Sequence, residues 1–233
     1  ALHDIIDDHT TISYGQIWNA FWTTDYKGNN VVWDMYSDGA NYSYYYTNGD
    51  DQCGTFLQEG DCYNREHSWP KSWFSGGEDG VPGRDLHHIF PTDGYVNQER
   101  SNYPYGEVRS GSGITTYQNG SKLGSCKSSL GYTGTVFEPI DEYKGDFARA
   151  CFYMSTRYYG EDSDWGSSGM TDKSDLKDWA ITMLLRWSDN DPVSDKEMDR
   201  NNAVYGIQGN RNPFIDHPEY AHIIWDPDWT GVT

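Results

Sequence analysis

The sequence predicts an α+β fold, and three observations lead to that class. Residues 14–21 carry apolar side chains at helical spacing. Between about residues 31 and 106, short apolar runs are interrupted by Gly, Pro, Asn and Asp, which indicates strands and loops. The last third returns to helical spacing. No internal repeat or linker stands out, so we expect one domain over residues 1–233.

The first elements follow directly from side-chain spacing. Apolar residues at i, i+3, i+4 and i+7 predict an early helix with one buried face; these are Tyr14, Ile17, Trp18 and Phe21. The segment 31–36 reads as a strand that enters a turn at 37–39. Residues 37–62 are rich in Gly, Asn, Asp and Tyr, which favours loops and short strands.

Four more helices are expected after residue 140. Their apolar faces are Phe147, Ala150, Cys151, Met154 and Tyr158; Leu176, Trp179, Ala180, Met183, Leu184 and Trp187; Val204 and Ile207; and Tyr220, Ile223, Ile224 and Trp225. Ser194 and Glu197 have the spacing of a capping box for the third of these. Asp216, ahead of Pro218, is the expected N-cap of the last.

The charge balance is strongly acidic, with 36 acidic residues against 17 basic ones and a net charge of -19. Only 36% of residues are hydrophobic, yet 16% are aromatic, which favours a folded chain over a disordered one. No apolar run approaches the roughly 20 residues of a membrane span. The mean field should repel polyanions, although residues 65–109 have a net charge of only -2.

Four cysteines occur, and none forms a Cys-x-x-Cys pair typical of zinc sites. We expect two disulfides in an exported protein, with four buried thiols as the alternative. Cys53 and Cys62 bracket a short loop, and Cys126 would then join Cys151. The sequence begins at Ala1 without a signal-peptide pattern, so we expect that any signal peptide has been removed.

The residues able to support chemistry gather between residues 62 and 106. Glu66 offers a hard carboxylate ligand and Asn97 an amide oxygen, a pair that leaves most of an octahedral Mg²⁺ shell open to water and phosphate oxygens. His67, whose ordinary pKa is near neutrality, is a natural general base for a water molecule. Adjacent strand residues point to opposite faces, so Glu66 and His67 can take different roles if the strand bends.

This region resembles the His-Me finger, or ββα-metal, nucleases, and most closely the bacterial endonuclease I family of secreted, sequence-nonspecific nucleases. The matching motifs are Asn64-Arg65-Glu66-His67 with Trp69-Pro70, Asp85-Leu86-His87-His88 with Pro91, Val96-Asn97-x-x-Arg100-Ser101-Asn102, Tyr143–Asp146 with Ala148–Ala150, and the tail 209–220. The likeness covers roughly residues 10–226. It implies a ββα-metal motif over about residues 62–106 that is surrounded by helices.

The resemblance also implies roles. His67 would activate water for in-line attack on a phosphodiester of DNA, and of RNA as well, giving 5′-phosphate and 3′-hydroxyl ends. Glu66 and Asn97 would hold one divalent ion, with Mg²⁺ expected and Ca²⁺ or Mn²⁺ as alternatives. Arg84 is the expected phosphate contact by its position. Arg100 competes for that role or anchors the helix that presents Asn97, and Arg65 is a further substrate-binding candidate.

Other interpretations remain open at this stage. His87 and His88 are more typical of structural packing, and Trp69 and Trp73 of a core. A glycoside hydrolase would use the abundant carboxylates without metal. A calcium-stabilised, non-catalytic binding module is the third possibility, although Asp189, Asp191 and Asp195 lack the glycine of an EF-hand turn.

The sequence also indicates where the protein is located and in which medium it works. The cysteines and the family resemblance together indicate a secreted or periplasmic bacterial protein, expected to be a monomer without a membrane segment. The acids are 26 Asp and 10 Glu against only eight Lys. That bias suits a salty medium, where screening weakens repulsion between the chain and a phosphate backbone.

Overall fold

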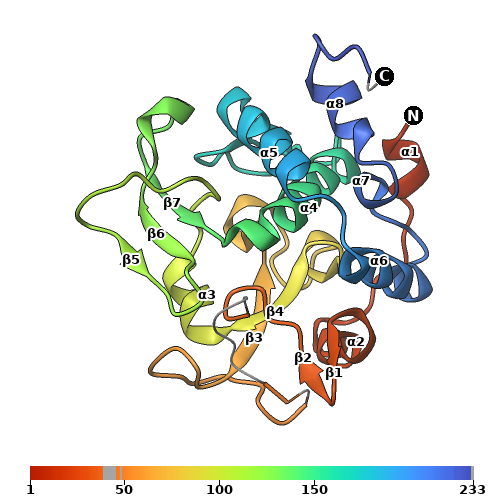
Figure 1. Ribbon diagram of the computed structural model, residues 1–233. Coiled ribbons are helices and arrows are strands. Elements are labelled where there is room, and N and C mark those ends of the chain that lie inside the picture. The colour runs from red at the N-terminus through yellow and green to blue at the C-terminus, as the bar shows by residue number, and fades with distance from the viewer. Residues whose placement is uncertain (39–45, 48, 232–233) are drawn as a thin grey trace.

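Figure 1 shows the computed structural model, which describes residues 1–38, 46–47 and 49–231. Helices and small antiparallel sheets are mixed along the chain, so the predicted α+β class is confirmed. The helices are α1 (His3–Ile6), α2 (Ile17–Thr24), α3 (Gly94–Arg100), α4 (Lys144–Arg157), α5 (Asp178–Asn190), α6 (Asp195–Gln208), α7 (Pro213–Asp216) and α8 (Glu219–Trp225). The strands are β1 (Tyr26–Gly28), β2 (Val31–Val32), β3 (Tyr63–His67), β4 (Ile89–Asp93), β5 (Thr115–Thr116), β6 (Lys122–Ser125), β7 (Thr135–Glu138), β8 (Thr171–Asp172) and β9 (Asp175–Leu176).

Helix α4 forms the centre of the main core. It packs against α5, as Figure 1 shows, and its predicted apolar face is buried. The same holds for the face of α5 from Ala180 to Trp187. Trp69 and Trp73 also lie in this core, as the sequence indicated. Burial of such faces, each large aromatic or aliphatic side chain contributing roughly 1.5–3 kcal/mol, is what fixes the position of the helices.

Strands β3 and β4 pair antiparallel and lead directly into α3, which gives a strand–strand–helix unit near the middle of the molecule (Figure 1). In the register, Glu66 faces Phe90 and His67 faces Ile89 across the ladder. The carboxylate of Asp93 accepts a hydrogen bond from the backbone N–H of Val96 and so caps α3. The unit places residues 64–67 and α3 side by side.

Several expected element ends differ from the structure. The strand predicted over 31–36 stops at Val32, because the Asp34 carboxylate accepts a hydrogen bond from the N–H of Tyr36 and turns the chain. Gly39, in the predicted turn, lies outside the described residues. Leu176 belongs to β9, and α5 begins two residues later.

The predicted last helix is present as α8 but its predicted N-cap was wrong, whereas the capping box of α6 is confirmed. Asp216 ends α7 and does not cap α8, because its carboxylate is paired with the Arg211 guanidinium. The N-cap of α7 is Asn212, whose side-chain oxygen accepts from the N–H of Phe214. The polar residue Asp216, two positions before Pro218, was therefore wrongly predicted to be the N-cap of α8.

One predicted disulfide is present and the other is absent. Cys53 is bonded to Cys62, as expected. Cys126 and Cys151 are free, buried thiols, so the expected bond between them was wrong. The physical reason is that Cys126 packs with Val108 and Val136 in a small cluster of its own, whereas Cys151 lies on α4 in the main core. Burial raises the pKa of the Cys126 thiol to about 11.

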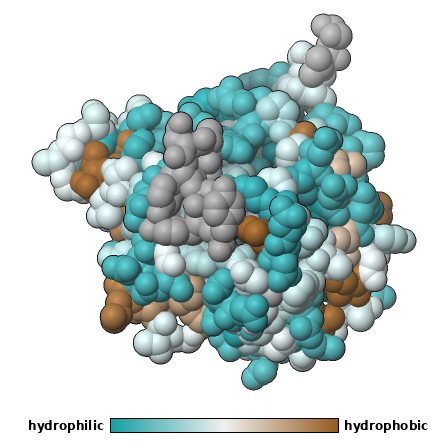
Figure 2. Space-filling view, turned by 60° about the horizontal axis from the view of Figure 1, so that its bottom comes forward, coloured by the Kyte–Doolittle hydropathy of each residue, from teal (hydrophilic) through white to brown (hydrophobic). Residues whose placement is uncertain are grey.

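The outer surface reflects the acidic composition. Figure 2 shows a mostly hydrophilic face with hydrophobic residues scattered over it in small groups. None of the helices in the described part of the chain has the length and apolarity that a membrane crossing requires.

Candidate active site

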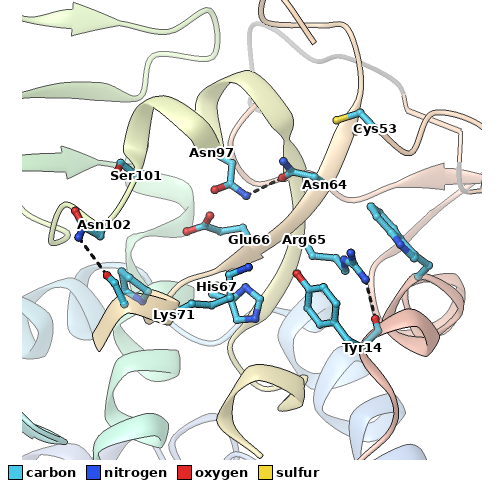
Figure 3. A pocket seen from close by; sticks show the side chains of 13 residues that line it. Tyr14, Cys53, Asn64, Arg65, Glu66, His67, Lys71, Asn97, Ser101 and Asn102 are labelled. Atoms are coloured by element: carbon cyan, nitrogen blue, oxygen red, sulfur yellow. Dashed lines mark hydrogen bonds between the residues drawn. The ribbon is translucent and has the colours of Figure 1, made fainter. Parts of the chain in front are cut away.

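A cavity of about 540 Å³ lies beside β3 and α3, and Figure 3 shows it from close by. Most of its lining is polar. The lining residues are Tyr14, Trp18, Cys53, Asn64, Arg65, Glu66, His67, Pro70, Lys71, Ser72, Asn97, Ser101 and Asn102. The structure therefore brings Glu66, His67, Asn97 and Arg65 together, from two segments about 30 residues apart in the sequence.

Successive side chains of β3 point to opposite sides of the strand, and this alternation sets where each one lines the cavity. Figure 3 shows Glu66 on the side of Asn97, and Arg65 on the opposite side with Tyr14. The cavity reaches both sides of the strand, so consecutive residues of one short strand line it in different places.

Glu66 is buried, with 2% of its surface exposed, and one of its oxygens is held by the protein. Oε1 accepts hydrogen bonds from the Tyr36 hydroxyl at 3.1 Å and from Nη1 of Arg100. Burial raises the pKa of Glu66 to about 7, and the Arg100 guanidinium opposes that rise. The other oxygen, Oε2, has no hydrogen bond among the described residues, which leaves it for a ligand in the cavity.

Asn97 is oriented by a neighbour. Its Nδ2 donates a hydrogen bond to Oδ1 of Asn64 at 2.7 Å, so its own carbonyl oxygen points towards the Glu66 carboxylate in Figure 3. A carboxylate and an amide oxygen on one side of a polar cavity are the hard ligands that Mg²⁺ prefers. The donor set of Glu66 and Asn97 therefore fits a divalent ion that prefers hard ligands.

A backbone carbonyl orients the His67 ring. Its Nε2 lies 3.1 Å from the carbonyl oxygen of Gly83. A carbonyl only accepts hydrogen bonds, so the ring carries its proton on Nε2 and Nδ1 holds the lone pair. Burial, with a smaller contribution from His88, holds the pKa of His67 well below its ordinary value of 6.5. The imidazole is therefore neutral at neutral pH.

The three candidate arginines lie in different surroundings. Arg65 lines the cavity, with its guanidinium 3.6 Å from the ring centroid of Tyr14 and 4.5 Å from that of Trp18. Arg100 is fully buried and donates to Glu66 and to the carbonyl oxygens of His67 and Ser68. It therefore anchors the site from behind and is not accessible to a substrate.

Arg84 is not among the residues that line the cavity. Its Nε donates to the carbonyl oxygen of Gly80 at 3.3 Å, within the segment that connects β3 to β4. The residue before it, Gly83, supplies the carbonyl that orients His67. The structure thus places the segment, but not the Arg84 side chain, at the cavity.

This chain resembles known proteins over most of its length. The family model for Endonuclease I matches residues 1–219. This chain belongs to the Endonuclease I family. An extracellular ribonuclease of Bacillus amyloliquefaciens is 38% identical over 97% of this chain and 72% of its own length. That of Bacillus subtilis (strain 168) is 37% identical over 96% and 72%. An extracellular deoxyribonuclease of Aeromonas hydrophila is 28% identical over 57% of this chain and 49% of its own length.

The resemblance to the Endonuclease I family that the motifs indicated is thus confirmed. Within this family member, His87 and His88 lie in the interior. Nε2 of His87 faces the carbonyl oxygen of Asn210, and that of His88 faces the carbonyl oxygen of Pro82 at 2.7 Å. Burial lowers the pKa of each to about 4. Neither is among the residues that line the cavity.

Several residues of this Endonuclease I site were not predicted from the sequence. Tyr14 and Lys71 line the cavity, Asn64 orients Asn97, and Tyr36 holds Glu66 from below. Asn64 stands within the motif and carried the clearest signal, because it lies next to the predicted substrate-binding arginine. Tyr36 is 30 positions from its partner, and the sequence contains nothing that links the two.

Proposed function

We propose that this chain is a divalent-metal-dependent, sequence-nonspecific endonuclease that cleaves DNA and RNA. The observation that supports it is one cavity in which a buried carboxylate, an amide oxygen and a neutral histidine converge, on residues 66, 97 and 67. The names of the relatives include both ribonuclease and deoxyribonuclease, which supports a broad nucleic-acid substrate. Family membership disfavours a glycoside hydrolase or a non-catalytic calcium module.

The chain's own residues account for most of the proposed reaction. Nδ1 of His67 accepts a proton from a water molecule as its oxygen attacks phosphorus. The P–O3′ bond breaks, the 5′ end keeps the phosphate, and the 3′ oxygen takes a proton from solvent. Arg65 and Lys71 neutralise phosphate oxygens at the cavity. Glu66 and Asn97 would hold Mg²⁺, which when bound supplies positive charge that stabilises the pentavalent phosphate and the leaving oxygen.

Low sequence selectivity fits the lining. The cations at the cavity, Arg65 and Lys71, suit contacts to the phosphate backbone, which carries no sequence information. The rings of Tyr14 and Trp18 hold the Arg65 guanidinium at the cavity, so they support the same backbone contact.

The test is cleavage of supercoiled plasmid and of a structured RNA by the wild-type chain and by His67→Ala. Loss of a general base of this kind should lower the rate by about 10²–10⁴-fold. EDTA should stop the wild-type enzyme, and Mg²⁺ should restore it. His217→Ala, which changes an exposed histidine on the loop between α7 and α8, is the matched control and should cleave as wild type. Near-wild-type cleavage by folded His67→Ala would refute the mechanism.

The proposal includes an extracellular or periplasmic location. Several relatives are named extracellular and one periplasmic, and disulfides such as Cys53–Cys62 typically form and persist in oxidising environments. Mass spectrometry of the chain from its natural host, comparing the culture medium with the cytosol, tests this location.

A further inference from the structure

A second group of metal-ligating side chains lies apart from the catalytic cavity, where α1 meets the end of α4. It consists of His3 in α1, Asp7 directly after α1, and Glu161 in the turn that follows α4. One ligand atom from each residue lies within 4.8 Å of the other two. Figure 1 shows α1 beside helices of the C-terminal half, which are far from it in the sequence.

The imidazole of His3 is fixed in a particular tautomer. Its Nδ1 lies 3.2 Å from the carbonyl oxygen of Thr156 and 3.1 Å from that of Arg157. Because both partners can only accept, Nδ1 carries a proton. Backbone carbonyls hold the ligating histidines of metal proteins in the same way, by accepting from the ring nitrogen that does not bind the metal. Nε2 is thereby turned towards the two carboxylates.

The distances around Nε2 do not correspond to hydrogen bonds. Oδ2 of Asp7 and Oε1 of Glu161 are each 3.8 Å from Nε2. That separation is too long for a hydrogen bond. Two ligands of one tetrahedral ion with bonds of about 2.1 Å are about 3.4 Å apart, so each of these two distances has to close by only a few tenths of an ångström. The two carboxylate oxygens lie within 4.8 Å of each other and have to approach as well.

The donor set also selects the kind of ion. One imidazole nitrogen with two carboxylate oxygens suits a borderline ion of the Zn²⁺ type, in contrast to the all-oxygen pair of Glu66 and Asn97. The Arg157 guanidinium donates to the same Oε1 of Glu161 at 2.8 Å and offsets one of the two negative charges. A carboxylate oxygen has two lone pairs, so the second one is left for an ion. A neutral His3 with Asp7, Glu161 and Arg157 then has a net charge of -1, which still attracts a cation.

We propose that His3, Asp7 and Glu161 form a binding site for Zn²⁺ or a transition-metal ion of the same class, with water as the fourth ligand. The site would tie the N-terminal helix α1 to the end of the central helix α4. Its role would be structural, because an ion that binds only the folded chain raises its stability.

The test uses a variant in which the catalytic cavity no longer has its metal-binding carboxylate and its histidine, so that ion binding there does not contribute to the signal. In a Glu66→Gln/His67→Ala background, titration calorimetry with Zn²⁺ should show one site per chain in the presence of millimolar Mg²⁺. At about ten times its dissociation constant, Zn²⁺ should raise the Tm by a few degrees. Co²⁺ in place of Zn²⁺ should give the visible absorption of a four-coordinate ion.

Single substitutions identify the residues that bind the Zn²⁺ ion. In the same background, His3→Gln should abolish both the heat and the Tm rise, and Asp7→Asn and Glu161→Gln should each weaken binding by about tenfold or more. His217→Gln, an exposed histidine next to Glu219, should bind as the background does. Absence of Zn²⁺ binding, retention of it in His3→Gln, or unchanged affinity in both carboxylate variants would each overturn the proposal.

Discussion

Glu66 owes its position to side chains that no substrate can reach. Its carboxylate is held by Arg100 and Tyr36, and the Tyr36 hydroxyl is in turn 2.9 Å from that of Tyr105. Placing a carboxylate in the interior costs free energy, which is why burial raises its pKa. The guanidinium of Arg100 offsets part of that cost and leaves one oxygen facing the cavity.

Removal of Arg100 should therefore destabilise the fold as well as the site. Arg100→Met breaks a fully buried ion pair and should lower the free energy of unfolding by about 3–5 kcal/mol, measured by urea denaturation at pH 8. The second variant, Arg100→Met/Glu66→Gln, removes the unpaired charge and should recover part of the loss. A loss below about 1 kcal/mol in Arg100→Met would show that the pair does not act as a buried unit.

Asn64 should determine how well Asn97 binds the metal. Asn64→Leu removes the acceptor for Nδ2 of Asn97, so the amide can rotate its oxygen away from Glu66. The Mg²⁺ concentration for half-maximal cleavage should then rise by about tenfold or more, with a matching loss of Mg²⁺ affinity in calorimetry. Asn64→Asp keeps an acceptor and should shift it less. Asn202→Leu, on the exposed side of α6, is the control, and equal shifts in Asn64→Leu and Asn202→Leu would contradict the assignment.

At the scale of elements, the Cys53–Cys62 bond closes the loop that leads into β3. Cys53 itself lines the cavity, and the two residues are nine apart in the sequence. Cys53→Ser/Cys62→Ser should lower the free energy of unfolding by about 2–3 kcal/mol, because the unfolded chain gains freedom. Since Cys126 and Cys151 are free, reducing agent should destabilise the wild-type chain and leave the double variant unchanged. A further loss on reduction of that variant would mean a second disulfide.

The junction of α4 with α5 should give stability a pH dependence. Asp191 follows α5 and accepts a hydrogen bond from the N–H of Gly145 at the start of α4. Burial, reinforced by the Asp146 carboxylate, raises the pKa of Asp191 to about 7, above its ordinary 3.8. Between these two pH values the folded chain binds more protons than the unfolded chain, so this group's contribution to stability is lost as pH rises towards 7.

The substitution Asp191→Asn removes that titration and keeps an acceptor for Gly145. The stability of Asp191→Asn relative to wild type should therefore increase from pH 5 to pH 8, in urea denaturation at each pH. Asp199→Asn, an exposed change on α6, should show no such trend. A difference between Asp191→Asn and wild type that is constant with pH would contradict the raised pKa.

Helix faces could be predicted because their information is local: the apolar spacing of α4 and α5 suffices to indicate which of their side chains are buried. The convergence of residues 64–67 with Asn97 was indicated by the family resemblance of the motifs. What was missed depends on which side chains pair with one another. Asp216 pairs with Arg211, five residues earlier, instead of capping a helix, and Tyr36 reaches Glu66 from a segment 30 residues away. Local propensity cannot specify contacts that only tertiary packing creates.

At the scale of the whole molecule, few of the cations lie at the cavity. Arg100, Arg149 and Arg200 are buried and paired with acids, so they contribute nothing to the outer field. Arg65 and Lys71 are the basic residues that line the cavity, and Lys71 is itself paired with the carboxylate of Glu78. Both lie on a chain with a net charge of -19. A nucleic acid therefore meets local attraction within a repulsive surrounding field.

This balance between local attraction and overall repulsion predicts that the rate of DNA cleavage first rises and then falls as the NaCl concentration increases. Screening shortens the range of the repulsion from about 10 Å at 0.1 M to about 3 Å at 1 M, whereas contacts within the cavity act over shorter distances. The KM for a long DNA should fall as NaCl rises from low to moderate concentration, with an activity optimum at elevated NaCl. A dinucleotide phosphodiester carries little charge and serves as the control, because its KM should change far less. An optimum for long DNA at the lowest salt, as expected of a basic nuclease that loses phosphate contacts, would show that attraction at Arg65 and Lys71 outweighs the charge of the whole chain.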